Sequence, residues 1–236
     1  MDTNSNNVIE TRSLSFSFRK NLVLDNLNIK IPRNSIYGLI GRNGAGKTTI
    51  IKLLVGLLSV PKKTVYYYGK DFSDNQVEIM RFVGCLIENP SLYNDLTCIE
   101  HFVYLNYFYN MDNSRIEEVL KMVGLWQDRE KKAKYLSLGM KQRLGIGMAL
   151  FHNPDIIILD EPMNGLDPLG IYEFRSILEM LKAQNKTIII SSHMLSEVEK
   201  ICTHIGIIDN CRLVFQDDIS YLNKQGLETL FFDLIK

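Results

Sequence analysis

Residues 36–48 read IYGLIGRNGAGKT, an apolar run that leads directly into a glycine-rich segment at residues 41–48. The segment satisfies the pattern G-x-x-x-x-G-K-[ST], in which glycines let the backbone turn tightly so that successive N–H groups point at phosphate oxygens. A helix is expected from Thr48 to about residue 58, and helix N-termini favour bound anions. Strand, loop and helix in this order predict an α/β fold of the P-loop NTPase class with a mainly parallel sheet.

Two side chains at the end of this loop carry its chemistry. Lys47 brings a positive charge to the β- and γ-phosphates, and the hydroxyl of Thr48 can bind Mg²⁺. The residues predicted to bind ATP in this segment are Gly41, Asn43, Gly44, Ala45, Gly46, Lys47, Thr48 and Thr49. The loop alone fits kinases, GTPases, motor proteins and transporter ATPases equally well.

A second buried strand, expected at residues 156–159, ends in two adjacent carboxylates. Ligands of an open α/β sheet bind beyond the carboxyl ends of its strands, so Asp160 and Glu161 are expected to face the nucleotide. Asp160 is predicted to hold Mg²⁺, through water, as acidic residues do in P-loop enzymes. Glu161 is placed to orient and deprotonate the attacking water as a general base.

The remaining pattern predicts one domain, residues 1–236, with a helical insertion. Apolar residues recur at helical spacing between residues 90 and 147, where strand patterns are absent. Further strands are expected at 14–18, 23–31, 64–68, 83–87, 187–190, 205–209 and 212–216, with helices at 168–182 and ending near 202. We therefore expect residues 1–89 and 148–236 to form a core with an N-terminal antiparallel β-subdomain, and residues 90–147 to form a helical subdomain.

Charge and apolar patterning limit the possible partners. Lys+Arg and Asp+Glu both total 27 in 236 residues, and this balance argues against a nucleic-acid partner. The four cysteines are scattered without zinc spacing. Residues 1–7 lack the pattern of a signal peptide, and no apolar run reaches the roughly 18–20 residues that cross a bilayer. Any work at a membrane would require a separate spanning chain.

Residues 136–144, LSLGMKQRL, resemble the signature motif of the ABC (ATP-binding cassette) family, usually Leu-Ser-Gly-Gly-Gln. The resemblance extends over residues 8–220 with the motifs in order. By this resemblance, the glycine-rich loop is the Walker A motif, and the carboxylates after the strand at 156–159 belong to the Walker B motif. Residues 164–167 correspond to the D-loop, and His193 corresponds to the switch histidine. Glu88 then occupies the Q-loop position, as a further Mg²⁺ ligand.

The resemblance also implies a composite site made by two chains. In the family, the signature residues matching Ser137 and Gly139 bind the γ-phosphate held by a partner cassette, and Asp167 belongs to the same nucleotide site. A single chain suggests a homodimer. Asp167 also fits a plain role as N-cap before Pro168. Phe18 is the candidate for stacking on adenine, with Phe16 less favoured, although a strand aromatic commonly belongs to the core.

Three departures from the family pattern point to one branch. Glu88 replaces Gln, Leu138 replaces the first signature Gly, and Met140 replaces the signature Gln. These features are similar to ATPase subunits of lantibiotic-immunity and bacitracin-resistance transporters from Gram-positive bacteria. The likeness implies a peripheral protein on the cytoplasmic face of the membrane, a permease partner and a membrane-active peptide as cargo. Aromatics at residues 101–109 are expected at the permease contact, or in part in the core.

Two other functions remain open from the sequence. One is a soluble ABC ATPase acting in DNA repair or on the ribosome, although such proteins usually carry long coiled coils or two cassettes. The other is a P-loop GTPase, whose guanine-reading motif requires an Asp after Asn-Lys-x. The segment Asn185-Lys186-Thr187-Ile188 has no such Asp.

Overall fold

The strand that precedes the glycine-rich loop lies inside a six-stranded sheet. The computed structural model describes residues 6–235. The sheet has the order β12-β11-β5-β10-β9-β8 and is parallel except for β12, which pairs antiparallel with β11. Its strands are β5 (Ile36–Gly41), β8 (Val83–Leu86), β9 (Ile156–Leu159), β10 (Thr187–Ser192), β11 (His204–Asp209) and β12 (Arg212–Asp218). The predicted α/β fold with a mainly parallel sheet is confirmed.

The central strands are aliphatic because helices and a second sheet cover both of their faces. All four residues of β9 are buried, as in parallel sheets generally. Ile156 and Ile158 pack on the side of helix α1 (Lys47–Leu54), whereas Ile157 and Leu159 pack on the side of α5 (Leu138–Leu150) and α6 (Pro168–Ala183). Because side chains alternate along a strand, the side chain of Asp160, the next residue, is expected on the same side of the sheet as α1.

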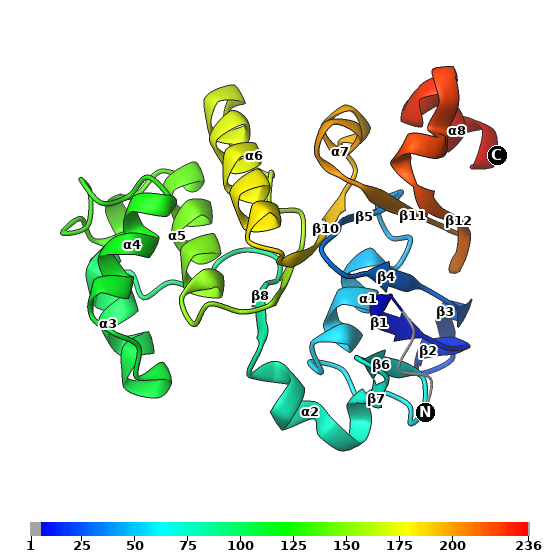
Figure 1. Cartoon of the computed structure of the whole chain (residues 1–236), viewed down its shortest axis with the longest axis horizontal. Coiled ribbons are helices and arrows are strands. Elements are labelled where there is room, and N and C mark those ends of the chain that lie inside the picture. The colour runs from blue at the N-terminus through cyan, green and yellow to red at the C-terminus, as the bar shows by residue number, and fades with distance from the viewer. Residues whose placement is uncertain (1–5, 236) are drawn as a thin grey trace.

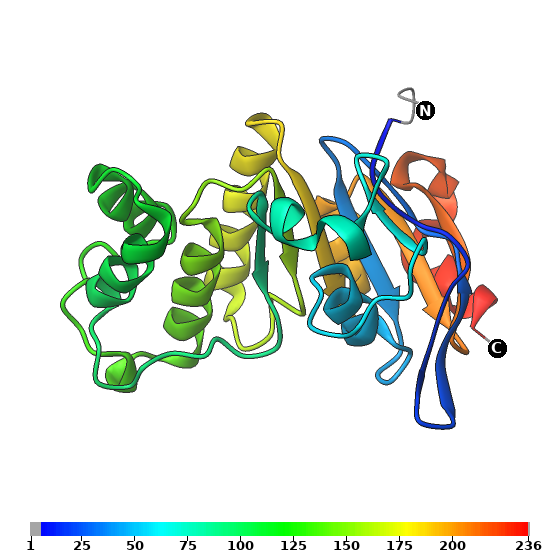
Figure 2. The same cartoon turned by 90° about the horizontal axis from the view of Figure 1, so that it is seen from below.

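A second, antiparallel sheet forms the N-terminal lobe beside the main sheet (Figure 1). It has the order β4-β1-β6-β7, with β1 at Asn7–Thr11, β4 at Lys30–Pro32, β6 at Val65–Tyr67 and β7 at Lys70–Asp71. Strands β2 (Leu14–Phe18) and β3 (Asn21–Leu27) form a hairpin that projects from the body of the molecule (Figure 2). The single strand expected at 23–31 is wrong: β3 ends at Leu27 and β4 begins at Lys30 in a different sheet, and Asn26, just before the break, has a left-handed φ of 53°.

Two helices differ from the sequence prediction. Helix α1 ends at Leu54 rather than near residue 58, because Gly56 adopts a φ of 72° and its N–H binds the Leu53 carbonyl. Helix α2 (Phe72–Met80) was not expected from the sequence, and only Phe72 and Ile79 of its side chains are buried. Asp71 caps it by accepting from the Ser73 N–H. The C-terminal residues form the turn η2 (Ile219–Gln225) and helix α8 (Gly226–Leu234), which packs on α7 (Leu195–Ile201).

Helices between β8 and β9 form a separate lobe at one end of the molecule (Figure 1). They are α3 (Cys98–Tyr109), α4 (Ser114–Met122), the turn η1 (Ala133–Tyr135) and α5. Thr97 and Glu100 form a capping box at the start of α3. Buried Phe102, Val119 and Leu144 join these helices to the core.

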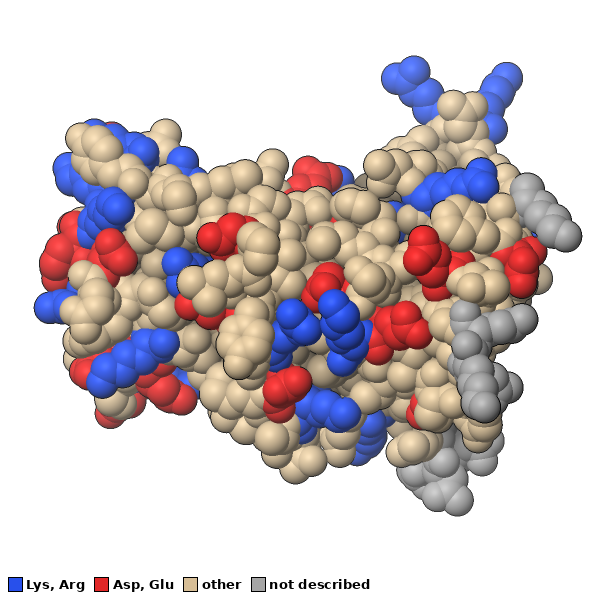
Figure 3. All heavy atoms as spheres, turned by 90° about the horizontal axis from the view of Figure 1, so that it is seen from above, with Lys and Arg blue, Asp and Glu red and all other residues tan. Residues whose placement is uncertain are grey.

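On the face drawn in Figure 3, charged side chains lie in small alternating groups rather than in one broad field of a single sign. Lys and Arg lie among Asp and Glu over the face drawn in Figure 3. None of the helices within residues 6–235 combines the length and the apolar character needed to cross a bilayer.

Candidate functional site

The glycine-rich loop joins β5 to α1 and curls around the lysine at its end. A side chain on Gly41 would collide with the Ile208 carbonyl oxygen, and Gly46 has a φ of 102°, so both positions require glycine. Lys47 is buried, and its Nζ donates to the carbonyl oxygens of Gly41 at 2.7 Å and Arg42 at 3.2 Å. The first turn of α1 has no acidic residue. The loop therefore presents N–H groups and one ammonium group to an anion.

The first carboxylate after β9 is buried and bound by two hydroxyl groups. Thr48 Oγ1 donates to Asp160 Oδ2 at 2.8 Å, and Ser191 Oγ donates to Asp160 Oδ1. Thr48 and Asp160, far apart in sequence, thus meet as the sequence predicted. Ser191, at the end of β10, was not identified from the sequence, because a serine in a strand carries no motif of its own.

The second carboxylate links the loop lysine to the histidine after β10. Glu161 Oε1 lies 3.6 Å from Lys47 Nζ, and Glu161 Oε2 lies 2.9 Å from His193 Nδ1. The backbone of Glu161 has a φ of 46°, which is uncommon for a residue with a side chain and is found at strained functional positions. Its N–H donates to Ser191 Oγ at 2.8 Å. The structure therefore brings Lys47, Glu161 and His193 together.

A cavity of about 260 Å³ lies in front of these groups. It is lined by Thr48, Glu88, Asn89, Gln142, Asp160, Glu161 and Asn164. Gln142 is buried and donates to the Pro162 carbonyl oxygen at 3.3 Å. Glu88 belongs to this wall, but it is 61% exposed and its carboxylate pairs with Lys52 Nζ at 2.6 Å. Gln142, Asn164 and Lys52 were not identified from the sequence.

The side chains at this cavity fit one magnesium ion. No cluster of three or more His, Cys, Asp or Glu side chains with metal-ligand geometry occurs within residues 6–235. Magnesium is usually bound through one or two carboxylates, with water and substrate phosphates completing its octahedron. The neighbouring hydroxyl of Thr48 and carboxylate of Asp160 match that donor set.

The signature segment forms a separate hollow of about 410 Å³. Ser137 caps α5 by accepting from the Met140 N–H at 3.2 Å, and Asp167 caps α6 by accepting from the Gly170 N–H at 2.8 Å. Ser137, Gly139 and Asp167 line this hollow, which shares no lining residue with the cavity at Asp160. Within one chain, the phosphate-binding residues around Lys47 and the signature residues around Ser137 therefore line separate hollows.

Phe18 lies near the tip of the β2–β3 hairpin rather than in the core. Its side chain is 48% exposed and contacts Phe16 edge-to-face with the ring centroids 5.0 Å apart. Phe16 is half-buried and packs against the N-terminal lobe. Of the two aromatics, Phe18 is therefore the one available to a ligand.

Comparison with known proteins finds close likeness over nearly the whole chain. Residues 24–164 match the pattern of the family described as ABC transporter. The chain is 42% identical to the bacitracin transport ATP-binding protein BcrA of Bacillus licheniformis, over 96% of this chain and 75% of that protein. It is 40% identical to the lantibiotic transport ATP-binding protein SrtF of Streptococcus pyogenes, over 95% and 96% of the two chains. A solved structure described as the ATP-binding subunit of an ABC transporter superposes with a TM-score of 0.87 at 28% identity, covering 97% and 100% of the chains.

Proposed function

This chain belongs to the ABC transporter family, and we propose that it powers the export or removal of a membrane-active antimicrobial peptide through a separate permease subunit. It is an ATP-binding subunit with ATPase activity. ATP hydrolysis is supported by the meeting of Lys47, Thr48, Asp160, Glu161 and His193 beyond the carboxyl ends of β5, β9 and β10. The observation that carries the peptide cargo is the likeness to the bacitracin and lantibiotic transport subunits. Fold and sequence likeness to transporter subunits favour this reading over a soluble ABC ATPase.

We assign the residues of this site as follows. Residues 41–49 bind the phosphates of ATP through backbone N–H groups and Lys47. Thr48 and Asp160 would hold Mg²⁺, and the ion would neutralise charge on the phosphates. Glu161 takes the proton of the water that attacks the γ-phosphate, and His193, held at 2.9 Å from Glu161, contacts that phosphate. Phe18 stacks on adenine. Glu88 adds negative charge beside the metal whenever its pair with Lys52 opens.

A second copy of the chain completes the site in this proposal. Ser137 Oγ and the N-terminal N–H groups of α5, a helix of 13 residues, form an anion site away from Lys47. Two chains arranged head to tail would place this hollow over the ATP bound by the partner. ATP should therefore produce a dimer on size-exclusion chromatography when hydrolysis is slowed by Glu161→Gln. Ser137→Glu, which adds negative charge at the hollow, should abolish that dimer.

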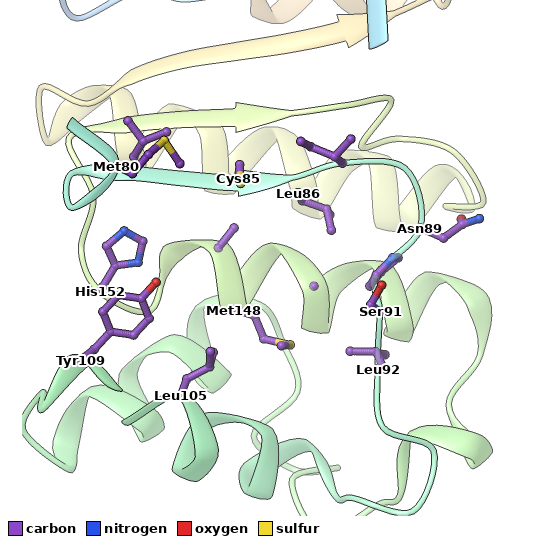
Figure 4. Close-up of a pocket in the computed structure, with 15 residues that line it drawn as sticks. Met80, Cys85, Leu86, Asn89, Ser91, Leu92, Leu105, Tyr109, Met148 and His152 are labelled. Atoms are coloured by element: carbon purple, nitrogen blue, oxygen red, sulfur yellow. The ribbon is translucent and has the colours of Figure 1, made fainter. Parts of the chain in front are cut away.

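A permease contact is proposed at the boundary of the two lobes. A cavity of about 480 Å³ there is lined by residues of β8, α3 and α5 and by the segment after β8, including Asn89 and Ser91 (Figure 4). Beside it, Tyr107 and Phe108 of α3 are 80% and 84% exposed. His101, in the same helix, is instead buried, and its Nε2 accepts from the Tyr93 N–H at 3.0 Å. The exposed aromatics are suited to an interface.

The chain would act at the cytoplasmic face of the membrane of a Gram-positive bacterium, attached through the permease. We propose one ABC ATPase domain, with residues 1–89 and 148–236 as its core and β-subdomain and residues 90–147 as its helical subdomain. The relatives named for bacitracin and lantibiotic transport support a peptide cargo.

Expression of the chain with a permease encoded beside it, in a sensitive host, tests this function. Resistance to bacitracin or to a lantibiotic should rise, and it should be lost with Lys47→Ala although the complex still assembles. The purified complex should hydrolyse ATP in a magnesium-dependent manner. A chain that hydrolyses ATP but copurifies with ribosomes, and with no membrane protein, would overturn the transport proposal.

A further inference from the structure

Strand β10 ends in two adjacent serines that face opposite sides of the sheet. Ile188 and Ile190 pack on the side of α5 and α6, and Ile189 packs on the side of α1. Because side chains alternate along a strand, Ser191 shares the side of Ile189 and Ser192 does not. Ser191 is fully buried, and the parallel register of β9 and β10 brings it next to Asp160.

The hydroxyl of Ser191 joins both carboxylate residues of the site. It donates to Asp160 Oδ1 and accepts the backbone N–H of Glu161 at 2.8 Å. The other oxygen of Asp160 accepts from Thr48 Oγ1 at 2.8 Å. Asp160 thus keeps one hydroxyl partner without Ser191, whereas the Glu161 N–H would lose the acceptor that it has.

The backbone at Glu161 requires such a restraint. Its φ of 46° lies in the left-handed region, which is unfavourable for a residue with a side chain relative to the right-handed region. A hydrogen bond from this N–H to a fully buried side chain opposes relaxation to a commoner conformation. Relaxation would swing the carboxylate away from Lys47 and His193, and displacement of a reacting group by about 1 Å can cost about 100-fold in rate.

We propose that Ser191 is a positioning residue for ATP hydrolysis, which holds the Glu161 carboxylate where it meets the attacking water. The inference rests on the proposed role of Glu161 as the general base. Ser191 contacts no phosphate or water in this role and acts through the backbone of its neighbour. The sequence feature that carries it is a hydroxyl residue two positions before His193, inside the strand that His193 follows.

Ser191→Ala tests the inference by separating turnover from binding. The turnover number with saturating MgATP should fall about 10–100-fold, the usual loss when a residue that orients a site carboxylate is removed. The dissociation constant of a fluorescent ATP analogue should change little, and the thermal midpoint should fall by an amount similar to that of another variant that loses a buried hydroxyl. Ser35→Ala is the matched control, because Ser35 is also buried and its hydroxyl donates to the Pro32 carbonyl oxygen, away from the site. Turnover of Ser191→Ala equal to that of Ser35→Ala would overturn the inference.

A double-mutant cycle with Glu161→Gln shows through which residue Ser191 acts. If Ser191 acts through Glu161, adding Ser191→Ala to Glu161→Gln causes no further loss of single-turnover rate. A full additional loss in the double variant would overturn the inference, since Ser191 would then act independently. Near-normal turnover of Glu161→Gln alone would instead show that the proposed base is wrong. Failure of the positioning role of Ser191 and failure of the proposed general base Glu161 therefore give different results.

Discussion

Replacing Glu161 by Gln is the sharpest test of the proposed chemistry. Gln keeps the shape of the side chain near Lys47 and His193 but removes its ability to take a proton from water. A general base contributes about 10²–10⁴-fold to rate, which corresponds to about 3–5 kcal/mol at about 1.36 kcal/mol per tenfold. We expect the turnover number to fall within that range.

Binding of ATP should respond differently from turnover. The Glu161 carboxylate lies 3.6 Å from Lys47 Nζ, a distance at which Coulomb's law with a dielectric of about 20 gives about 5 kcal/mol of gross attraction. Desolvation offsets a large part of that attraction. Neutralising Glu161 also removes its repulsion of the γ-phosphate, so ATP affinity should stay the same or increase.

Phosphate release and equilibrium binding measure the two quantities separately. Steady-state phosphate release with saturating MgATP gives the turnover number, and titration with a fluorescent ATP analogue gives the affinity. Glu78→Gln is the matched control, because Glu78 is exposed, pairs with Lys70 Nζ at 2.7 Å and lies on α2, outside the site. Hydrolysis by Glu161→Gln within tenfold of the control would refute the role of Glu161 as general base.

Three further sets of substitutions test features that lie outside the centre of the site. Glu88→Gln should raise the Mg²⁺ concentration needed for half-maximal ATP hydrolysis, because it removes a carboxylate beside the metal. Lys52→Gln should lower that concentration, because Lys52 holds the Glu88 carboxylate at 2.6 Å. Equal magnesium titrations for both variants would contradict a role of Glu88 at the metal. Gly165→Ala should lower the free energy of unfolding in urea by about 1–2 kcal/mol, the cost of a left-handed φ, here 77°. A second part of its cost, from collision with the Leu138 side chain, should vanish in a Leu138→Ala background. Burial, together with the nearby positive charges of Arg115 and Lys186, lowers the pKa of His152 below its ordinary 6.5. As the pH drops, the unfolded chain therefore binds a proton at this histidine before the folded chain does. The free energy of unfolding should consequently fall as the pH drops below about 6.5. His152→Phe, which keeps the stacking on the neighbouring tyrosine, should remove that part of the pH dependence in urea unfolding at pH 5.5 and 7.5.

The sequence predicted the centre of the site because chemistry and topology coincide there. Asp160, Glu161 and His193 directly follow the ends of buried parallel strands. Lys47 and Thr48 begin the helix that follows the loop after a third such strand. Parallel strands bring such ends to one edge of the sheet, so local patterns suffice to gather residues that are far apart in sequence. The same reasoning predicted the sheet itself, whose strands are short aliphatic runs.

The surrounding contacts could not be predicted because they depend on register and backbone conformation. Ser191 reaches Asp160 only through the pairing of β10 with β9, and Lys52 reaches Glu88 from the last turn of a helix that ends earlier than expected. The left-handed conformation of Glu161 follows from tertiary contacts and not from its residue type, since Glu has no preference for that region.

Two of the three departures from the usual family pattern, Leu138 and Glu88, are each matched by a neighbouring residue. The Leu138 side chain, which is 58% exposed, packs over Gly165. A Cβ atom on residue 165 would collide with this leucine, so Leu138 fits there only because residue 165 is glycine. Glu88 places a carboxylate where an amide is usual, and Lys52 supplies the positive charge that offsets it. The contact between Leu138 and Gly165 is steric, whereas that between Glu88 and Lys52 is electrostatic. High salt should therefore weaken only the Glu88–Lys52 pair. Raising the salt concentration should therefore bring the magnesium titration of wild type toward that of Lys52→Gln, while the coupling between Leu138→Ala and Gly165→Ala in unfolding free energy stays constant.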